Sequence, residues 1–260
     1  MEVHHHSHTS GKKWAHYFWE FLMLFLAVFC GFLAENQREH MIEHQREKQY
    51  MITMLDDLKA DTSLLNSTVK NWEYVNYSID SVADAITFPL ATADLPKAYR
   101  HINEALNYWS FIYNDRTITQ LKNSGSFRLI RNKVVANKII AYDRFNNDAI
   151  KNIALQHNKF YENATALRSR VFVEEIITGI HKKYKNDPPP PFINSWIDSL
   201  ITKKKMPLTG EDQTTLLFEF KNALLALKRD YDGNMIWGYK TTQVLIEELI
   251  KLIRENYHLK

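Results

Sequence analysis

Glycine and cysteine are both scarce in this chain. Only 7 glycines occur in 260 residues, which favours long helices over a sheet whose strands must be joined by turns. The single cysteine, Cys30, excludes an intramolecular disulfide. An apolar share of 45% is sufficient for a hydrophobic core. We therefore predict an all-α protein that is stabilised by packing.

The chain also lacks an excess of charge of either sign. Its 33 basic and 30 acidic residues leave a net charge of +3, so we expect no nucleic-acid partner. Phosphate-binding loops, dinucleotide fingerprints, nucleophile elbows and paired-cysteine metal motifs are all missing from the sequence. These absences favour a protein that is not an enzyme.

One long apolar segment is present, at residues 14–36. A hydrocarbon core of about 30 Å needs roughly 20 helical residues, and this segment reaches that length only with the aromatic residues at its start, which are typical of the membrane interface. A cleaved signal peptide is the rival interpretation, because Lys12 and Lys13 precede the segment. Cleavage after Ala34 would place Phe32 where a small residue is required. We predict an uncleaved transmembrane anchor.

Basic residues on the two sides of the span are close in number. Lys12 and Lys13 precede it, whereas Arg38, Arg46 and Lys48 follow it. A long domain can cross a membrane largely regardless of such charges. We therefore expect a short cytoplasmic N-terminus and a large domain on the other side.

Four residues of the span fall on one helical face. Glu20, Ala27, Gly31 and Ala34 are spaced by seven, four and three residues, which keeps them in phase on a helix that turns about 100° per residue. Small residues let helix backbones approach closely in lipid, so this face predicts self-association or a membrane partner. The alternative is an ordinary anchor with incidental small residues. Glu20 is then either a carboxylate at the interface or a polar, proton-bearing contact inside an oligomer.

A charged helix is expected to follow the span without a break and to end at Pro89. Glu35, Glu39, Glu43 and Glu47 recur every four residues among basic neighbours. Apolar residues then follow at spacings of three or four, as in an amphipathic or coiled-coil helix. The expected apolar positions are Leu55, Leu58, Thr62, Leu65, Val69, Trp72, Ile79 and Ile86, with a weak point at Asn76.

The sequence HMIEH within this helix matches the H-x-x-E-H pattern of inverted zinc peptidases. His40 and His44 would be metal ligands and Glu43 the general base, but a third ligand is needed and none is indicated. A structural or adventitious metal site is one alternative. A solvated charged face is the commonest meaning of such a pattern.

Four further histidines lie in the N-terminal tail, residues 1–13. His4, His5, His6 and His8 are able to chelate a divalent metal ion, although a tail of this kind binds metals weakly and with little selectivity. We therefore expect no cofactor beyond weakly bound divalent metal.

Further helices are expected after Pro89. The apolar spacing predicts a second helix over 97–115 and a third helical region over 133–184, which bends or breaks near Asn146 and Asn147. Between them we expect a glycine loop. In this loop Gly125 ends a short helix in a left-handed conformation, and the residues that dock back onto the bundle are Phe127, Leu129 and Ile130.

Four consecutive prolines are the strongest interruption in the chain, and they predict a stiff spacer at 188–192. A short helix is expected at 193–201, and Thr209 is a candidate cap of a last long helix, which Gly233 and Gly238 interrupt. The chain is thus divided into a His-rich tail (1–13), an anchor (14–36), a juxtamembrane helix with the main bundle (37–187), the proline spacer (188–192), and C-terminal helices that pack on the bundle (193–260).

Three segments stand out together: the apolar segment that begins at Glu20 and ends at Asn36, the segment LDDLKAD at 55–61, and the glycine loop LKNSGSFRLIRN at 121–132. In this layout the chain resembles a Bacteroidota family of single-span membrane proteins that is catalogued as a domain of unknown function. The resemblance implies an inner-membrane anchor with a helical periplasmic domain and supplies no activity. The loop is its most specific part, and its residues of interest are Gly125, Leu129, Arg131 and Asn132.

We therefore expect a membrane-anchored helical scaffold or an accessory subunit of a cell-envelope complex. Its partners would be the lipid bilayer and either a second copy of itself or a larger membrane complex. A periplasmic helical sensor that binds a small ligand or a metal is the alternative function. A zinc-dependent hydrolase that uses His40, Glu43 and His44 is a remote alternative.

Overall fold

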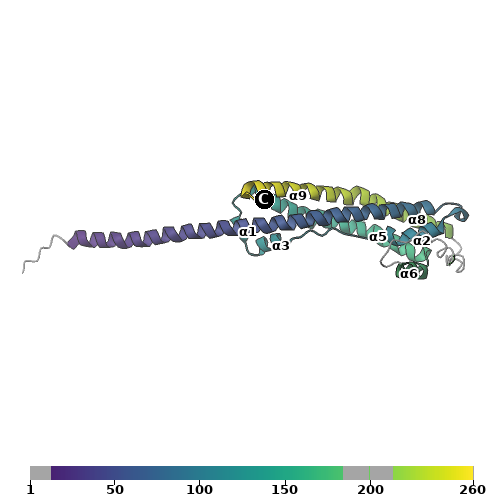
Figure 1. Ribbon diagram of the computed structural model, residues 1–260, viewed down its shortest axis with the longest axis horizontal. Helices are drawn as coiled ribbons and strands as arrows, with labels where there is room; N and C mark the ends of the chain where they lie inside the picture. Colours follow the sequence, from purple (N-terminus) through teal and green to yellow (C-terminus); the bar gives the residue numbers. More distant parts are fainter. Residues whose placement is uncertain (1–12, 184–198, 200–212, 260) are drawn as a thin grey trace, which may run out of the picture.

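The computed structural model describes residues 13–183, 199 and 213–259 (Figure 1). Helices are the only regular elements of these residues, which confirms the all-α prediction. The first helix, α1 (Lys13–Ala85), has 73 residues and is therefore about 110 Å long. Its N-terminal part extends alone to the left in Figure 1, while the rest of α1 lies within a helical bundle.

Two further rods pack beside the second half of α1. Each rod consists of two α-helices that one π-helical segment joins, so the chain direction continues through the joint. The expected irregularity near Asn146 and Asn147 is one of these π-helical segments. The first rod comprises α4 (Lys133–Arg144), η3 (Phe145–Ile150) and α5 (Lys151–Val171), and the second comprises α8 (Gln213–Asp230), η4 (Tyr231–Met235) and α9 (Ile236–Tyr257).

Contacts along α1 fix the directions of the two rods. The α4–α5 rod runs parallel to α1, because Tyr142 contacts Asp61 and His157 contacts Trp72 farther along. The α8–α9 rod runs antiparallel, since Lys228 pairs with Asp80 whereas its far end returns to the start of the bundle. The C-terminus of α9 therefore lies at the end of the bundle from which the apolar part of α1 emerges (Figure 1).

Shorter helices close the two ends of the bundle. The pair α2 and α6 lies at the end far from the apolar run, and α3 lies beside α1 near the opposite end (Figure 1). Their bounds are η1 (Leu90–Thr92), α2 (Leu95–Ala105), α3 (Arg116–Asn123), η2 (Ser126–Leu129) and α6 (Glu174–Lys183).

A continuous seam of buried residues runs along α1. The spacing alternates strictly between four and three residues, which is the period of a left-handed coiled coil. Apolar burial along this seam is the main stabilising contribution of α1 to the bundle. Within α1 the seam consists of Glu47, Met51, Met54, Leu58, Asp61, Leu65, Thr68, Trp72, Val75, Ile79 and Val82, and Ile86 continues it just after the helix ends.

The observed seam differs in part from the apolar stripe that the sequence predicts. Leu55, Leu58, Leu65, Trp72, Ile79 and Ile86 are buried as predicted. Thr62 and Val69 are only partly buried, because the polar residues one position earlier, Asp61 and Thr68, occupy the seam instead. The weak point at Asn76 disappears for the same reason, since Val75 is the buried residue there.

The predicted second helix over 97–115 is wrong in its second half. Helix α2 ends at Ala105, and Trp109 and Ile112 are 51% and 74% exposed. The backbone of this stretch is held by side chains instead of by a helical ladder. Trp72 Nε1 donates to the carbonyl of Trp109 at 2.8 Å, and the N–H of Phe111 donates to the Tyr239 hydroxyl at 3.2 Å.

Candidate functional site at the junction of the apolar helix and the bundle

The first part of α1 is apolar and uncovered. Within the described residues, one helix is long and apolar enough to cross a membrane, and it is the N-terminal part of α1. Glu20, Ala27, Gly31 and Ala34 are all exposed on it. A Cβ atom added at Gly31 would meet no atom within 4 Å. A single copy of the chain therefore leaves this face free to contact lipid or another helix.

Glu47 is the first buried residue of the seam and connects three segments. Its Oε1 atom accepts hydrogen bonds from the backbone N–H of Arg131 at 2.7 Å and from the Tyr257 hydroxyl at 2.6 Å. The Glu47 side chain is only 2% exposed. Burial raises the pKa of Tyr257, and the hydrogen bond to Glu47 raises it further. The phenol therefore stays protonated and remains a donor to Glu47.

Arg131 fastens the glycine loop to α1. Its guanidinium donates to the carbonyl of His40 at 3.1 Å, and its Nε lies 3.9 Å from Glu47 Oε2. His44 Nδ1 lies 3.5 Å from the same Glu47 oxygen. Two residues of the HMIEH sequence and one of the glycine loop therefore meet at one place.

The geometry of the loop follows from two local features. Gly125 has a φ of 65° and follows the end of α3, which confirms the expected left-handed conformation. Asn132 caps α4 through Oδ1, which accepts from the N–H groups of Val134 at 2.9 Å and Val135 at 3.2 Å. The Nδ2 atom of Asn132 donates to Asn256 Oδ1 at 2.5 Å, so the cap also binds the end of α9.

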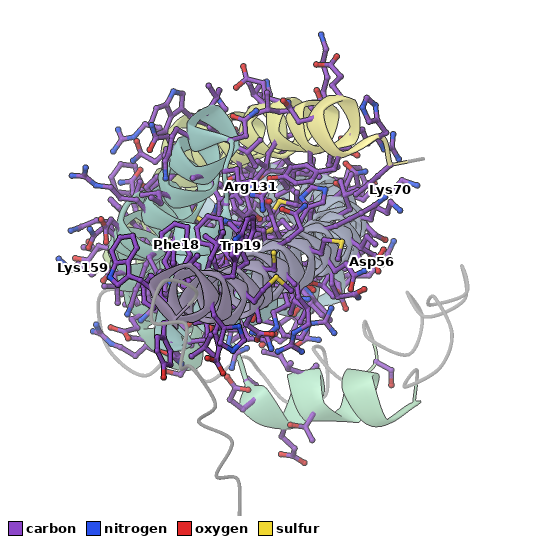
Figure 2. The ribbon with its side chains drawn as sticks, turned by 90° about the vertical axis from the view of Figure 1, so that its left-hand side faces the viewer. Phe18, Trp19, Asp56, Lys70, Arg131 and Lys159 are labelled. Atoms are coloured by element: carbon purple, nitrogen blue, oxygen red, sulfur yellow. The ribbon has the colours of Figure 1, made fainter. Side chains whose placement is uncertain are left out.

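We call this region the junction, and it comprises 37–48 of α1, the loop 124–132 and the end of α9 at 255–259. Viewed from the apolar end of α1, Arg131 lies between α1 and α9 (Figure 2). Two hollows open here, with volumes of about 270 Å³ and about 600 Å³. The smaller is lined by His44, Glu47, Lys48, Arg131, Asn132, Asn256, Tyr257 and His258, and the larger by Gln37, His40, Glu43, Arg128, Leu129 and Arg131.

Asp57 binds the N-terminal turn of α3. Its Oδ2 accepts from the backbone N–H of Thr117 at 3.0 Å and from the hydroxyl of the same residue. Its Oδ1 accepts from Asn114 at 3.0 Å and from Arg116 at 2.6 Å. Asp57 is 1% exposed, so these four bonds hold α3 against α1.

Asp61 lies one helical turn farther along and binds the same segment. It accepts from the backbone N–H of Asn114 at 2.7 Å and from the Tyr142 hydroxyl at 2.6 Å. Burial raises the pKa of Asp61 and the nearby Asp57 adds to the rise, while the two hydrogen bonds oppose it. The two carboxylates thus join three elements, α1, α3 and α4.

A third polar contact lies deeper in the bundle, between α5 and α8. His157 Nδ1 lies 2.8 Å from Asp230 Oδ2, and Asn234 donates to the other Asp230 oxygen at 2.6 Å. The rings of Trp72 and Tyr108 enclose the imidazole at centroid distances of 5.1 Å and 5.3 Å. Burial lowers the pKa of His157, against the opposing effect of Asp230. A neutral histidine in this place pairs two helices.

Predicted site residues fall into three groups. His40 and His44 come together with Leu129, Arg131 and Asn132 at the junction. Glu20, Ala27, Gly31 and Ala34 stay separate from it on the apolar part of α1. The tail histidines, the proline spacer, the 193–201 helix apart from residue 199, and Thr209 lie outside the described residues.

The described part of the chain provides no third ligand for a metal ion at His40 and His44. No group of three or more histidine, cysteine, aspartate or glutamate side chains there is placed to hold a metal ion. His40 Nδ1 lies 3.9 Å from Glu43 Oε2, and His44 is turned toward Glu47 instead.

Sequence reasoning did not identify Glu47, Tyr257 or Arg128 as site residues. A signal for Glu47 was present, because it precedes Met51 by four residues and Met54 by seven and therefore lies on the buried face. Tyr257 and Arg128 carry no local signal, since only the return of α9 and of the loop brings them to α1.

Comparisons with protein-family models, with curated proteins and with solved structures gave no match. The fold and the site define a class directly. This chain is an all-α protein in which one long apolar helix, suited to a single membrane span, continues into the core of a helical bundle.

Proposed function

We propose that this protein is a membrane-anchored helical scaffold or an accessory subunit of a cell-envelope complex, which self-associates or binds a partner through its span. The observation that carries the proposal is the unbroken course of α1. One helix bears both the exposed face of Glu20, Ala27, Gly31 and Ala34 and the buried seam of the bundle.

The chemistry of the exposed face supports association within a bilayer. Lipid tails are as apolar as leucine, so helices in lipid associate through close packing and polar contacts instead of hydrophobic burial. Gly31 and Ala27 permit such an approach, and Glu20 would offer a polar contact one turn inside the interface. A second copy of the chain, or a partner helix, would cover the face of Glu20, Ala27, Gly31 and Ala34 that a single copy leaves exposed.

An inner-membrane location, with a short cytoplasmic N-terminus and the bundle in the periplasm, is part of the same proposal. The length of the apolar segment supports a single span, and a large domain can cross a membrane largely regardless of the charges beside the span. Accessibility labelling of single cysteines introduced in the N-terminal tail and in the bundle of a Cys30→Ser variant, in intact and in opened cells, would test the orientation.

Replacement of Gly31 by leucine tests the association directly. The isolated helix has room for the new side chain, so the fold of the bundle should be unchanged while close approach of two spans is blocked. We expect native mass spectrometry in a mild detergent to show a shift from oligomer to monomer.

A matched control is Leu33→Phe, which adds bulk on the opposite side of the same helix. This variant should assemble like the natural protein. If Gly31→Leu assembles equally well, or if the natural protein is a monomer without partners in native membranes, the proposed association is wrong.

A further inference from the structure

The larger hollow of the junction lies just beyond the end of the apolar segment. Gln37 and His40, which line it, follow Asn36 by one and four residues. At 1.5 Å per helical residue, His40 is about 6 Å beyond Asn36. The polar headgroup layer of a bilayer is roughly 5–8 Å deep on each side. If α1 spans a membrane as proposed above, this hollow opens among the lipid headgroups.

Two of the six residues that line this hollow are arginines, Arg128 and Arg131. Glu43 is the one carboxylate in the lining, so the basic side chains outnumber the acidic one. Arg128 is exposed and forms no hydrogen bond or ion pair within the described ranges. Arg131 uses one nitrogen for the His40 carbonyl, places its Nε 3.9 Å from Glu47 Oε2, and leaves 55% of its side chain exposed. Guanidinium donors therefore remain available for a ligand.

The neighbouring hollow contributes one further exposed basic side chain. This is Lys48, which lines it together with Arg131, while the carboxylate of that hollow, Glu47, is buried beneath the loop and accepts from the Arg131 N–H and the Tyr257 hydroxyl. The loop also carries Leu129, which is partly exposed beside Arg128. Basic side chains next to an apolar one form a surface suited to a bilayer interface.

We propose that the junction binds the phosphate of an anionic lipid headgroup, with Arg128 and Arg131 as its principal donors. Arginine presents paired N–H groups that match the oxygens of a phosphate, and such charge-assisted bonds are the strongest available to a side chain at a wet surface. This inference rests on the membrane anchoring proposed above and names a second partner for the same helix.

Headgroup binding would serve the bundle mechanically. Between Asn36 and Glu47 the helix α1 is contacted by the glycine loop, through Arg131 and His40, and near Glu47 also by the end of α9. A lipid phosphate held by Arg128 and Arg131 on that side would attach the loop to the membrane surface. The bundle would then be supported at two points, the span and the loop.

The test uses the full chain reconstituted in nanodiscs that contain equal parts of phosphatidylcholine and phosphatidylglycerol. Native mass spectrometry after gentle release counts the lipids that stay bound. The natural protein should retain phosphatidylglycerol in preference to phosphatidylcholine. Arg128→Gln should reduce that preference about fivefold, since each basic side chain at an anionic surface contributes roughly a factor of this size.

Lys159→Gln is the matched control, because it removes the same charge from an exposed position on α5 far from the junction (Figure 2). It should retain phosphatidylglycerol like the natural protein. Equal retention of both lipids by the natural protein, or an equal loss in both variants, overturns the inference. In a further experiment, inorganic phosphate is added to the nanodiscs. If phosphate then binds in place of lipid, the site takes a soluble ligand and the inference is overturned.

Failure of the anchoring is distinguishable from failure of the headgroup site. A protein that does not enter nanodiscs, and that alkaline carbonate extracts from membranes, refutes the proposed function. A protein that enters nanodiscs and shows no lipid preference refutes the headgroup site alone.

Discussion

Asp57 accepts hydrogen bonds from both the backbone N–H and the hydroxyl of Thr117, 60 residues farther along the chain. Thr117 belongs to the first turn of α3, whose N–H groups have no partner within that helix. The carboxylate therefore acts as a helix cap that another helix supplies, and its negative charge faces the positive end of the α3 dipole. Such a contact fixes both the position and the direction of α3.

Removal of this carboxylate should destabilise the bundle strongly. Asp57→Ala leaves the buried N–H and hydroxyl of Thr117 and the partly buried amide of Asn114 without their acceptor, while the exposed Arg116 side chain turns to water, so we expect a cost of about 3 kcal/mol in the free energy of unfolding. Urea denaturation followed by circular dichroism measures the loss. The neighbouring Asp56 is the control, because its side chain is 62% exposed. Equal unfolding midpoints for Asp56→Ala and Asp57→Ala would contradict the prediction.

Glu47 should be replaceable by glutamine but not by alanine. The amide oxygen of glutamine still accepts from the Arg131 N–H and from the Tyr257 hydroxyl, whereas alanine leaves both donors buried and unpaired at a cost of about 2–3 kcal/mol. Hydrogen exchange of the loop amides should accelerate in Glu47→Ala alone. The control is Glu39→Ala at an exposed position of the same helix. Loop exchange that is as fast in Glu39→Ala would show that Glu47 does not hold the loop.

The same glycine-to-alanine change should have opposite signs at two positions. Gly125 has a φ of 65°, which alanine adopts only at a cost of about 1 kcal/mol. Gly233 lies within the helical η4 segment with open space around its Cα, and alanine there should stabilise by up to about 1 kcal/mol. Thermal unfolding of the two variants checks the contrast. Two shifts of the same sign would refute it.

The stability of the bundle should depend on pH through Asp61. Burial raises its pKa in the folded state above the ordinary 3.8 of an aspartate. The unfolded chain therefore releases its proton first as the pH rises, and the free energy of unfolding falls between pH 3.8 and the higher native pKa. Asp61→Asn removes the proton and keeps an oxygen acceptor, so its pH profile should be flatter in that window. Asp56→Asn is the control, and a profile of Asp61→Asn that parallels the natural one would exclude Asp61 as the source.

The sequence predicted the long elements of the fold well, because periodicity and glycine conformation are local properties. The unbroken α1, the apolar seam residues Leu58 and Trp72, and the left-handed Gly125 all follow from spacing and backbone chemistry. The predicted apolar stripe is wrong at the positions where the buried residue of the seam is polar. Asp61 is buried because Asn114 and Tyr142 donate to it, and those partners lie more than 50 residues away.

The end of α2 and the junction also depend on contacts between residues far apart in the chain, which local patterns do not show. The apolar spacing in 97–115 is compatible with a helix, but side chains of α1 and α9 hold the backbone after Ala105 in another form. At the junction, the sequence indicates unrelated roles for two residues: His40 as a candidate metal ligand and Arg131 as part of the glycine loop. Only the folded chain shows that they belong to one site.

The continuity of α1 joins its apolar part rigidly to the bundle. Eleven seam positions of α1 pack inside the bundle, so the helix cannot turn about its axis there without breaking that packing. If α1 spans a bilayer as proposed, a neighbouring helix that packs against Gly31 sets the rotation of α1 about its own axis. It thereby also sets which side of the bundle faces the next copy. The spacing and handedness of an array of such proteins would then be set by one small face near the N-terminus, and α1 would transmit that orientation without a hinge over the roughly 80 Å from Gly31 to Ala85.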